Sequence, residues 1–245
     1  MTRWLQYFDT LRPESPLYRV QAAIYVDSLA VAVGLKGTER VLDFGCGFGF
    51  VAALLAPRVG ELWWWDGSPN MRAATARHTA HLPHANACDL TALADSPPQD
   101  AVWAGPAFDV ILVNSVVQYM SPEDIRGWLG RWRAMLSADG RLVLSDLIPA
   151  RHNGLADIAD LLRLGVRHGS PLRAASDALG GVARYKRANR AVPLTRIDVE
   201  DLRGWAAGAG FELALLQDNL THFRTRWGGV LRREVSSALR RLQAL

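Results

Sequence analysis

The chain has 245 residues, and 49% of them are hydrophobic, which suffices for one large domain with a sizeable core. Its two cysteines are too few for a disulfide framework or a structural zinc site, and no apolar run reaches the roughly 20 residues of a membrane span. The net charge of +4 is carried almost entirely by arginine and gathers in residues 151–190 and 222–245, which fits either an anionic partner or a solvated surface.

Apolar residues recur at helical spacing near the N-terminus, and short apolar strands alternate with helices after it. Ser68 and Pro69 form the usual start of a helix, since serine is a favoured N-cap and proline a favoured first helical residue. The elements expected in the first half are a helix over residues 15–35, a strand at Arg40–Phe44, a helix over residues 48–57, a strand at Glu61–Trp65, a helix from Ser68 and a weak strand near His84–Ala87.

The alternation continues in the second half with one interruption. Residues 150–190 break the rhythm and are predicted to form a helical insertion with loops, and Val230–Leu245 is predicted to be a basic amphipathic helix. The other elements expected here are a strand at Phe108–Val113, a helix at Pro122–Leu136, a strand at Arg141–Asp146 after the Asp139-Gly140 turn, a helix at Asp198–Ala207, and strands at Phe211–Gln217 and Thr221–Trp227.

Strands that alternate with helices of ten or more residues predict a parallel sheet joined by right-handed crossovers. We therefore expect an α/β fold with a Rossmann-like, doubly wound, mostly parallel sheet of seven strands. A helical cap precedes this sheet, and the helical insertion follows its fifth strand.

The most informative segment is a glycine-rich loop, V-L-D-F-G-C-G-F-G, at residues 41–49. Its glycines let backbone amides approach a ligand closely, because glycine has no Cβ and tolerates positive φ. Dinucleotide folds use G-x-G-x-x-G to hold pyrophosphate at a helix N-terminus, whereas here the spacing is G-x-G-x-G and Phe50 takes the place of the third glycine. Asp43 would repel a pyrophosphate and suits a cationic ligand, so the loop argues against NAD.

This loop resembles the first motif of the class I S-adenosylmethionine-dependent methyltransferases, an acidic residue followed by G-x-G-x-G. Other segments resemble further motifs of that family in the same order, over about residues 38–148. They are Asp66 after the second strand, Cys88-Asp89-Leu90 after the third, Phe108–Ser115 at the fourth, the turn at Leu136–Leu144 into the fifth, and a weaker match at Asp201–Phe211.

The resemblance implies that the chain binds S-adenosylmethionine and releases S-adenosylhomocysteine. It implies that Asp66 bridges the ribose hydroxyls, that Asp89 accepts from the adenine amine, and that the end of the fourth strand faces the methionine part and the acceptor. The expected cofactor-binding residues are Asp43, Phe44, Gly45, Cys46, Gly47, Asp66, Gly67, Met71, Cys88, Asp89, Leu90, Asn114 and Ser115. Plainer roles stay open, with Asp43 as a structural carboxylate, Asp66 as a helix cap and Asp89 as a surface-loop residue.

Methyl transfer from a sulfonium chiefly needs the acceptor held in line at about 3 Å and water excluded. A general base helps when the acceptor is a hydroxyl or an acidic carbon, and is dispensable for a carboxylate or a free amine. The candidate catalytic residues are His152 after the fifth strand, His222 near the last strand and Tyr119 after the fourth. A structural or solvated histidine is the alternative in each case.

The acceptor is expected under a lid made of the N-terminal segment and the insertion. Tyr7, Tyr18, Arg163 and Arg167 are the candidate acceptor-binding residues. Arginine forks recognise carboxylates and phosphates bidentately, so an anionic metabolite or natural-product intermediate is one hypothesis, and a solvated helical face is the other.

We thus expect a single methyltransferase domain over residues 1–245, cytoplasmic because no signal peptide is visible, with a small-molecule acceptor, no bound metal, and a monomeric or homodimeric state. Its expected parts are a helical cap over 1–37, a cofactor-binding core over 38–148, an acceptor lid over 150–195, and C-terminal strands and helix over 196–245. The alternatives are an RNA or protein methyltransferase and a non-catalytic relative that binds the cofactor. Asn114-Ser-Val-Val117 lacks both the Pro-Pro signature of adenine-directed enzymes and the Pro-Cys nucleophile of cytosine C5 enzymes, so a nucleic-acid acceptor is disfavoured.

Overall fold

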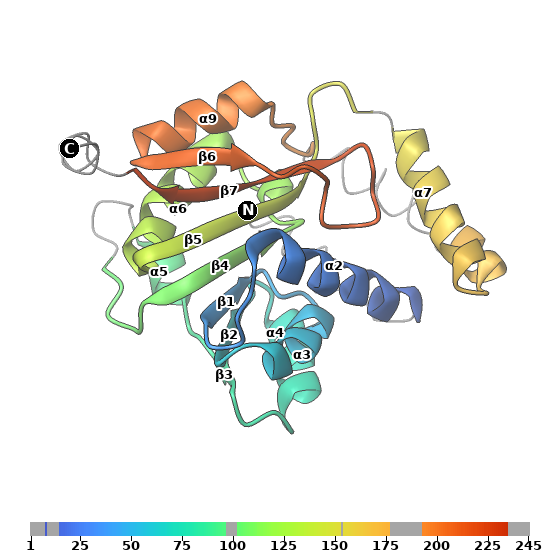
Figure 1. The fold of residues 1–245 in the computed structure, drawn as a ribbon, viewed down its shortest axis with the longest axis horizontal. Helices are drawn as coiled ribbons and strands as arrows, with labels where there is room; N and C mark the ends of the chain where they lie inside the picture. The colour runs from blue at the N-terminus through green and yellow to red at the C-terminus, as the bar shows by residue number, and fades with distance from the viewer. Residues whose placement is uncertain (1–7, 9–14, 97–101, 153, 177–192, 235–245) are drawn as a thin grey trace.

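The computed structural model describes residues 8, 15–96, 102–152, 154–176 and 193–234. Seven strands form one sheet in the order β3-β2-β1-β4-β5-β7-β6, as Figure 1 shows. The first five strands pair in parallel, and β7 runs antiparallel to both β5 and β6, so the predicted doubly wound, mostly parallel sheet is confirmed. The strands are β1 Arg40–Phe44, β2 Glu61–Trp65, β3 Ala85–Ala87, β4 Phe108–Asn114, β5 Leu136–Leu147, β6 Phe211–Leu215 and β7 Trp227–Arg233.

Helices cover both faces of the sheet and enclose two apolar cores (Figure 1). One core lies between the sheet and α2 and α3, and α4 packs on α3; the other lies under α5, α6 and α9. The helices are α2 Leu17–Val33, α3 Phe50–Leu55, α4 Pro69–Thr79, α5 Thr91–Asp95, α6 Pro122–Met135, α7 Gly154–Arg167 and α9 Val199–Gly208, with short 3₁₀ turns η1 Ala56–Arg58 and η3 Val117–Tyr119.

Two helix starts follow directly from local sequence chemistry. The Ser68 side chain accepts a hydrogen bond from the backbone N–H of Met71, and proline fills the first helical position of α4, as predicted. Ser121 and Asp124 form a reciprocal capping box at the start of α6. These caps fix where each helix leaves the carboxyl edge of the sheet, which is the edge that carries ligands in such folds.

The expected turn before the fifth strand is wrong, because β5 already begins at Leu136. The Asp139-Gly140 pair lies within β5, where its pairing with β4 shifts between Phe108 and Val110. A Cβ at residue 140 would lie 2.7 Å from the Phe108 carbonyl oxygen. The glycine therefore allows close approach of two strands rather than a reversal of the chain.

The expected last strand is also wrong, since β7 is Trp227–Arg233 rather than Thr221–Trp227. The Gly228-Gly229 pair, which is typical of a turn, lies inside β7. A Cβ at residue 228 would lie 2.7 Å from the Leu144 carbonyl oxygen, so the glycine again serves strand packing. Residues 230–233 of the predicted C-terminal helix are therefore strand, and residues 235–245 lie outside the described ranges.

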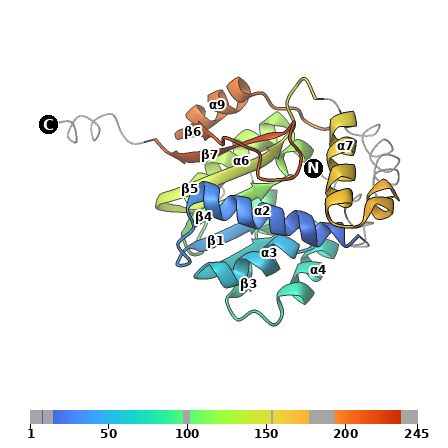
Figure 2. The ribbon, with the colours of Figure 1, turned by 45° about the vertical axis from the view of Figure 1, so that its right-hand side comes forward.

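The insertion after β5 does contain a helix, α7, which stands apart from the two layers of helices (Figure 2). It is tied to the segment before β7 through Asp160, a carboxylate only 5% exposed that accepts from the backbone N–H and Nε of Arg224. Within the described ranges, no helix is long and apolar enough to cross a membrane, and no group of three His, Cys, Asp or Glu side chains is placed to hold a metal ion.

Candidate functional site

A cavity of about 310 Å³ opens at the carboxyl ends of β1, β2 and β4. This edge is where ligands bind in doubly wound sheets. All the expected cofactor-binding residues line it except the segment Cys88-Asp89-Leu90. The lining residues are Phe8, Tyr18, Asp43, Phe44, Gly45, Cys46, Gly47, Phe48, Val51, Trp65, Asp66, Gly67, Met71, Asn114, Ser115, Val116, Tyr119 and Met120.

The glycine loop is held to the end of β2 by backbone hydrogen bonds. The N–H groups of Gly45 and Cys46 both donate to the Trp65 carbonyl oxygen, at 2.7 and 3.1 Å. A Cβ at residue 45 would lie 2.3 Å from Val116 Cγ2, so this position has no room for a side chain. Gly47, with φ +56°, has no neighbouring atom within 4 Å of where a Cβ would lie, so a ligand can approach the loop there without meeting a side chain.

Asp66 joins the glycine loop to the start of α4. Its Oδ2 accepts from the N–H of Gly47 at 3.0 Å, and its Oδ1 accepts from the N–H of Ser68 at 2.8 Å. Ser68, rather than Asp66, is the N-cap of α4. The carboxylate also lines the cavity.

Asp43 brings a buried carboxylate to the same cavity. The residue is 3% exposed, and its Oδ2 has no hydrogen-bond partner among the described residues. Burial, and then the nearby charge of Asp66, raises the pKa of Asp43 to about 7. A cation in the cavity would supply the missing partner and favour the ionised form.

The segment Cys88-Asp89-Leu90, expected near the adenine, is not among the residues that line the cavity. Cys88 and Leu90 are buried in the core on the α6 side of the sheet. Asp89 is exposed, and its Oδ1 accepts from the backbone N–H of Thr91 at 2.9 Å, at the start of α5. In the described structure these residues therefore do not line the cavity.

A second pocket of about 190 Å³ adjoins the first. Residues common to both pockets are Tyr18, Cys46, Phe48, Val51, Asn114 and Ser115. Residues that line only the second are Gln21, Ala22, Tyr25, Phe50, Asp146, Thr221, His222 and Phe223. The two pockets thus meet at the end of β4, beside the glycine loop.

A buried ionic network borders the second pocket. Asp146, at the end of β5, is 1% exposed, and its Oδ2 lies 2.6 Å from Arg226 Nη1 and also accepts from Ser115 Oγ. Its Oδ1 accepts from Thr221 Oγ1 at 2.8 Å, and Arg226 Nη2 reaches Asp157 on α7 at 2.6 Å. Ser115 and Asp146 have positive φ values of 57° and 63°, a conformation that persists in such residues only where surrounding contacts fix it.

The three candidate catalytic residues lie at three different places in the structure. His222 lines the second pocket and Tyr119 lines the first. His152 lines neither, and its Nε2 lies 3.1 Å from Asp157 Oδ2. His152 and His222 both lie in loops at the carboxyl edge of the sheet, so the sequence gives no reason to prefer one of them as the catalytic residue.

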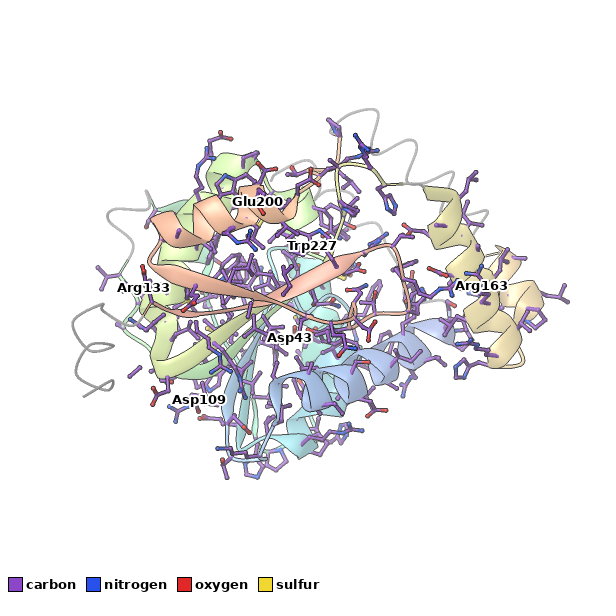
Figure 3. The ribbon with its side chains drawn as sticks, turned by 45° about the horizontal axis from the view of Figure 1, so that its top comes forward. Asp43, Asp109, Arg133, Arg163, Glu200 and Trp227 are labelled. Atoms are coloured by element: carbon purple, nitrogen blue, oxygen red, sulfur yellow. The ribbon has the colours of Figure 1, made fainter. Side chains whose placement is uncertain are left out.

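Of the candidate acceptor-binding residues, one lines the pockets and the two arginines do not. Tyr18 lines both pockets, and Tyr7 lies outside the described residues. Arg163 lies on α7 at the edge of the molecule, far from Asp43 in Figure 3, and its Nη1 is 2.5 Å from Asp160 Oδ1. Arg167 is exposed on the same helix. Neither arginine lines a pocket.

Several apolar residues of the first cavity were not predicted from the sequence, namely Phe48, Val51, Val116 and Met120. Phe48 and Val51 belong to the glycine loop and the helix after it, so the motif itself could have indicated them. Val116 and Met120 flank the 3₁₀ turn η3 that follows β4, for which the sequence carries no periodic pattern.

The chain matches a family model described as "Methyltransferase domain" over residues 42–142. It is 32% identical over 147 residues to an uncharacterized methyltransferase of Mycobacterium bovis, a match that covers 59% of this chain and 70% of that protein. It is also 35% identical over 122 residues to a probable non-canonical nonribosomal peptide synthetase of Salinispora arenicola. That match covers 49% of this chain and 2% of the synthetase.

Among solved structures, the fold is similar to that of magnesium protoporphyrin IX methyltransferase from Synechocystis with bound S-adenosylhomocysteine. The TM-score is 0.56 at 17% sequence identity, and the match covers 95% of this chain and 94% of that one. The match in fold therefore extends well beyond residues 42–142.

Proposed function

Because this chain belongs to the class I S-adenosylmethionine-dependent methyltransferases, we propose that it methylates a small-molecule acceptor, with the cofactor in the larger cavity and the acceptor in the adjoining pocket. When bound, S-adenosylmethionine supplies a methyl group activated on a sulfonium. The residues of this chain then have to hold the two reactants in line and keep water away from them.

The observation that carries this proposal is the buried Asp43 carboxylate, whose Oδ2 has no partner among the described residues, beside a glycine loop that a ligand can approach closely. Asp43 favours a positively charged ligand, and the cofactor carries positive charge at its sulfonium and amino groups. Asp66 lines the same cavity, and carboxylate oxygens are hydrogen-bond acceptors, which suits the ribose hydroxyls. Trp65, Gly67 and Met71 line the same part of the cavity, so we assign them to the nucleoside as well.

We assign the acceptor to the second pocket because that pocket meets the first at Asn114 and Ser115, where the fourth strand ends. No lysine or arginine lines either pocket within the described ranges, and Arg163 and Arg226 are both paired with carboxylates. These placements support a neutral acceptor over the anionic one that the arginine-rich insertion indicated. Enclosure by apolar and aromatic side chains favours a small molecule over RNA or a protein.

Isothermal titration with S-adenosylmethionine, S-adenosylhomocysteine and NAD tests the cofactor assignment. We expect wild-type protein to bind the two adenosyl ligands and not NAD, and Asp66→Ala to weaken both by tenfold or more, because each lost charged hydrogen bond is worth about 1.5–3 kcal/mol.

The matched control is Asp95→Ala, which removes an exposed carboxylate at the end of α5 and should leave binding unchanged. Thermal melting of both variants shows whether they remain folded. Unaltered affinity in a folded Asp66→Ala protein would mean that the nucleoside does not occupy this cavity.

A further inference from the structure

The second pocket contains a histidine whose two ring nitrogens have no hydrogen-bond partner within the described part of the chain. His222 Nδ1 and Nε2 are both buried, and neither is hydrogen-bonded to another described residue. The ring packs against Phe223 with a centroid distance of 3.9 Å. Buried polar atoms nearly always have a partner in native proteins, so a ligand group in this pocket is the natural partner for one of these nitrogens.

Charged groups from three elements face this imidazole. They are Asp146 at the end of β5, Asp157 and Asp160 on α7, and Arg226 before β7. Burial lowers the pKa of His222 below its ordinary value of 6.5, and Arg226 acts in the same direction, whereas the three carboxylates oppose the shift. The ring is therefore neutral near pH 7 and has a lone pair with which to accept a proton.

Aromatic rings form much of the remaining wall. Tyr18 and Tyr25 come from α2, Phe48 and Phe50 from the glycine loop and the start of α3, and Phe223 from the segment before β7. Tyr18 lies 5.7 Å from Phe48 and 6.4 Å from Phe50 between ring centroids. Flat aromatic walls favour a flat aromatic ligand, which stacks or meets them edge to face.

We propose that His222 is the general base of the methyl transfer and that the acceptor is the hydroxyl of a small aromatic alcohol held in the second pocket. This inference rests on the proposed function. A ring nitrogen of His222 takes the hydroxyl proton while the acceptor oxygen bonds to the methyl carbon. The bond from that carbon to sulfur breaks, and its electron pair stays on the sulfur. Positive charge thus passes to the imidazolium, which Asp146 and the α7 carboxylates stabilise.

The two other candidates fit this step less well. His152 lines neither pocket, and Asp157 engages its Nε2. Tyr119 lines only the cavity assigned to the cofactor, with its ring 4.9 Å from that of Phe8. A free tyrosine has a pKa of about 10, so its hydroxyl is a poor proton acceptor near neutral pH.

Binding of 4-methylphenol to the protein loaded with S-adenosylhomocysteine tests the inference without turnover. We expect saturable binding at pH 7.5 that weakens as the pH falls below 6.5 and His222 gains a proton. His222→Phe keeps a ring and removes both nitrogens, so it should weaken 4-methylphenol binding about tenfold, as expected for one lost buried hydrogen bond, and abolish the pH dependence. The methyl ether of the same probe, which has no proton to donate, should bind both proteins equally.

Activity provides the second readout. Transfer of the methyl group from S-adenosylmethionine to 4-methylphenol should fall by 100-fold or more in His222→Phe, within the range of general-base catalysis, and free imidazole should restore part of it in His222→Ala. His81→Phe, at an exposed histidine after α4, is the matched control and should behave as wild type.

Equal 4-methylphenol binding in wild type and His222→Phe, or no saturable binding at all, would overturn the inference. Titration of S-adenosylhomocysteine into His222→Phe keeps the two proposals apart. Normal affinity there, with no role for His222, leaves the proposed function standing, whereas failure of wild-type protein to bind S-adenosylhomocysteine refutes that function itself.

Discussion

At the scale of single residues, Asp43 sets the character of the larger cavity. It is the next-to-last residue of β1, one of its carboxylate oxygens has no hydrogen-bond partner among the described residues, and its pKa is raised from 3.8 to about 7. Since the folded-state pKa is above the unfolded one, this carboxyl favours folding at pH values below about 4, and that contribution is lost as the pH rises through 7. At neutral pH, ionisation of Asp43 is therefore unfavourable in the free protein, and a cationic ligand would stabilise the ionised carboxylate.

Asp43→Asn tests this argument. We expect the variant to unfold at a temperature roughly 2–4 °C higher than wild type at pH 8, as for a gain of about 1 kcal/mol, and to lose the advantage at pH 4, where the wild-type carboxyl is protonated. In wild type, affinity for S-adenosylmethionine should rise between pH 6 and pH 8 as Asp43 ionises, and in the variant it should be weaker and nearly independent of pH. Thermal melts and calorimetric titrations at these pH values measure both effects.

Adenosine, which carries no positive charge, is the control ligand, and its affinity should not improve with pH in either protein. A wild-type affinity for S-adenosylmethionine that stays constant from pH 6 to pH 8 would contradict the assignment of Asp43 to the charged part of the cofactor.

At the scale of elements, the Arg226 side chain joins the end of β5 to α7. It is only 13% exposed and contacts Asp146 and Asp157, both at 2.6 Å, while its guanidinium lies 4.2 Å from the centre of the Phe223 ring. The two carboxylates come from elements that have few other contacts with each other, since α7 stands apart from the layers of helices (Figure 2). The arginine therefore fastens α7 to Asp146, a residue that lines the second pocket.

Arg226→Gln should destabilise the protein by roughly 3–5 kcal/mol, because it leaves two partly or fully buried carboxylates without their cation. Chemical denaturation measures the loss, and hydrogen exchange should show faster exchange in α7 than in the sheet. Arg203→Gln removes an exposed pair with Glu200 and should change stability by less than about 1 kcal/mol. Equal losses in the two variants would show that Arg226 does not fasten the insertion.

Some helices and strands could be predicted from the sequence, and others could not. Strands β1, β2 and β4 and helices α4 and α6 follow from apolar runs and from caps such as Ser68 and Ser121, because local chemistry alone determines them. The start of β5 and the whole of β7 could not be predicted in this way. Gly140 and Gly228 are placed where neighbouring backbone comes too near for a Cβ, and such contacts arise only after the sheet has formed.

At the scale of the whole molecule, the site is built from segments far apart in the chain. The glycine loop, Asp66 and the end of β4 were predictable, because each is part of an ordered motif at the end of a strand. His222 and Asp146 meet only because β7 returns antiparallel beside β5, and this pairing brings the segment before β7 to the carboxyl edge. No spacing in the sequence distinguishes His222 from His152, since the fold alone turns one toward a pocket and the other toward Asp157.

The proposed methyl transfer requires that the cofactor cavity and the acceptor pocket meet at Asn114 and Ser115. A crystal structure of the protein with S-adenosylhomocysteine tests it most directly. We predict that the nucleoside lies against the glycine loop, that its ribose hydroxyls contact Asp66, and that the ligand's sulfur faces the pocket that contains His222. A nucleoside bound elsewhere, or a sulfur that faces away from that pocket, would contradict it.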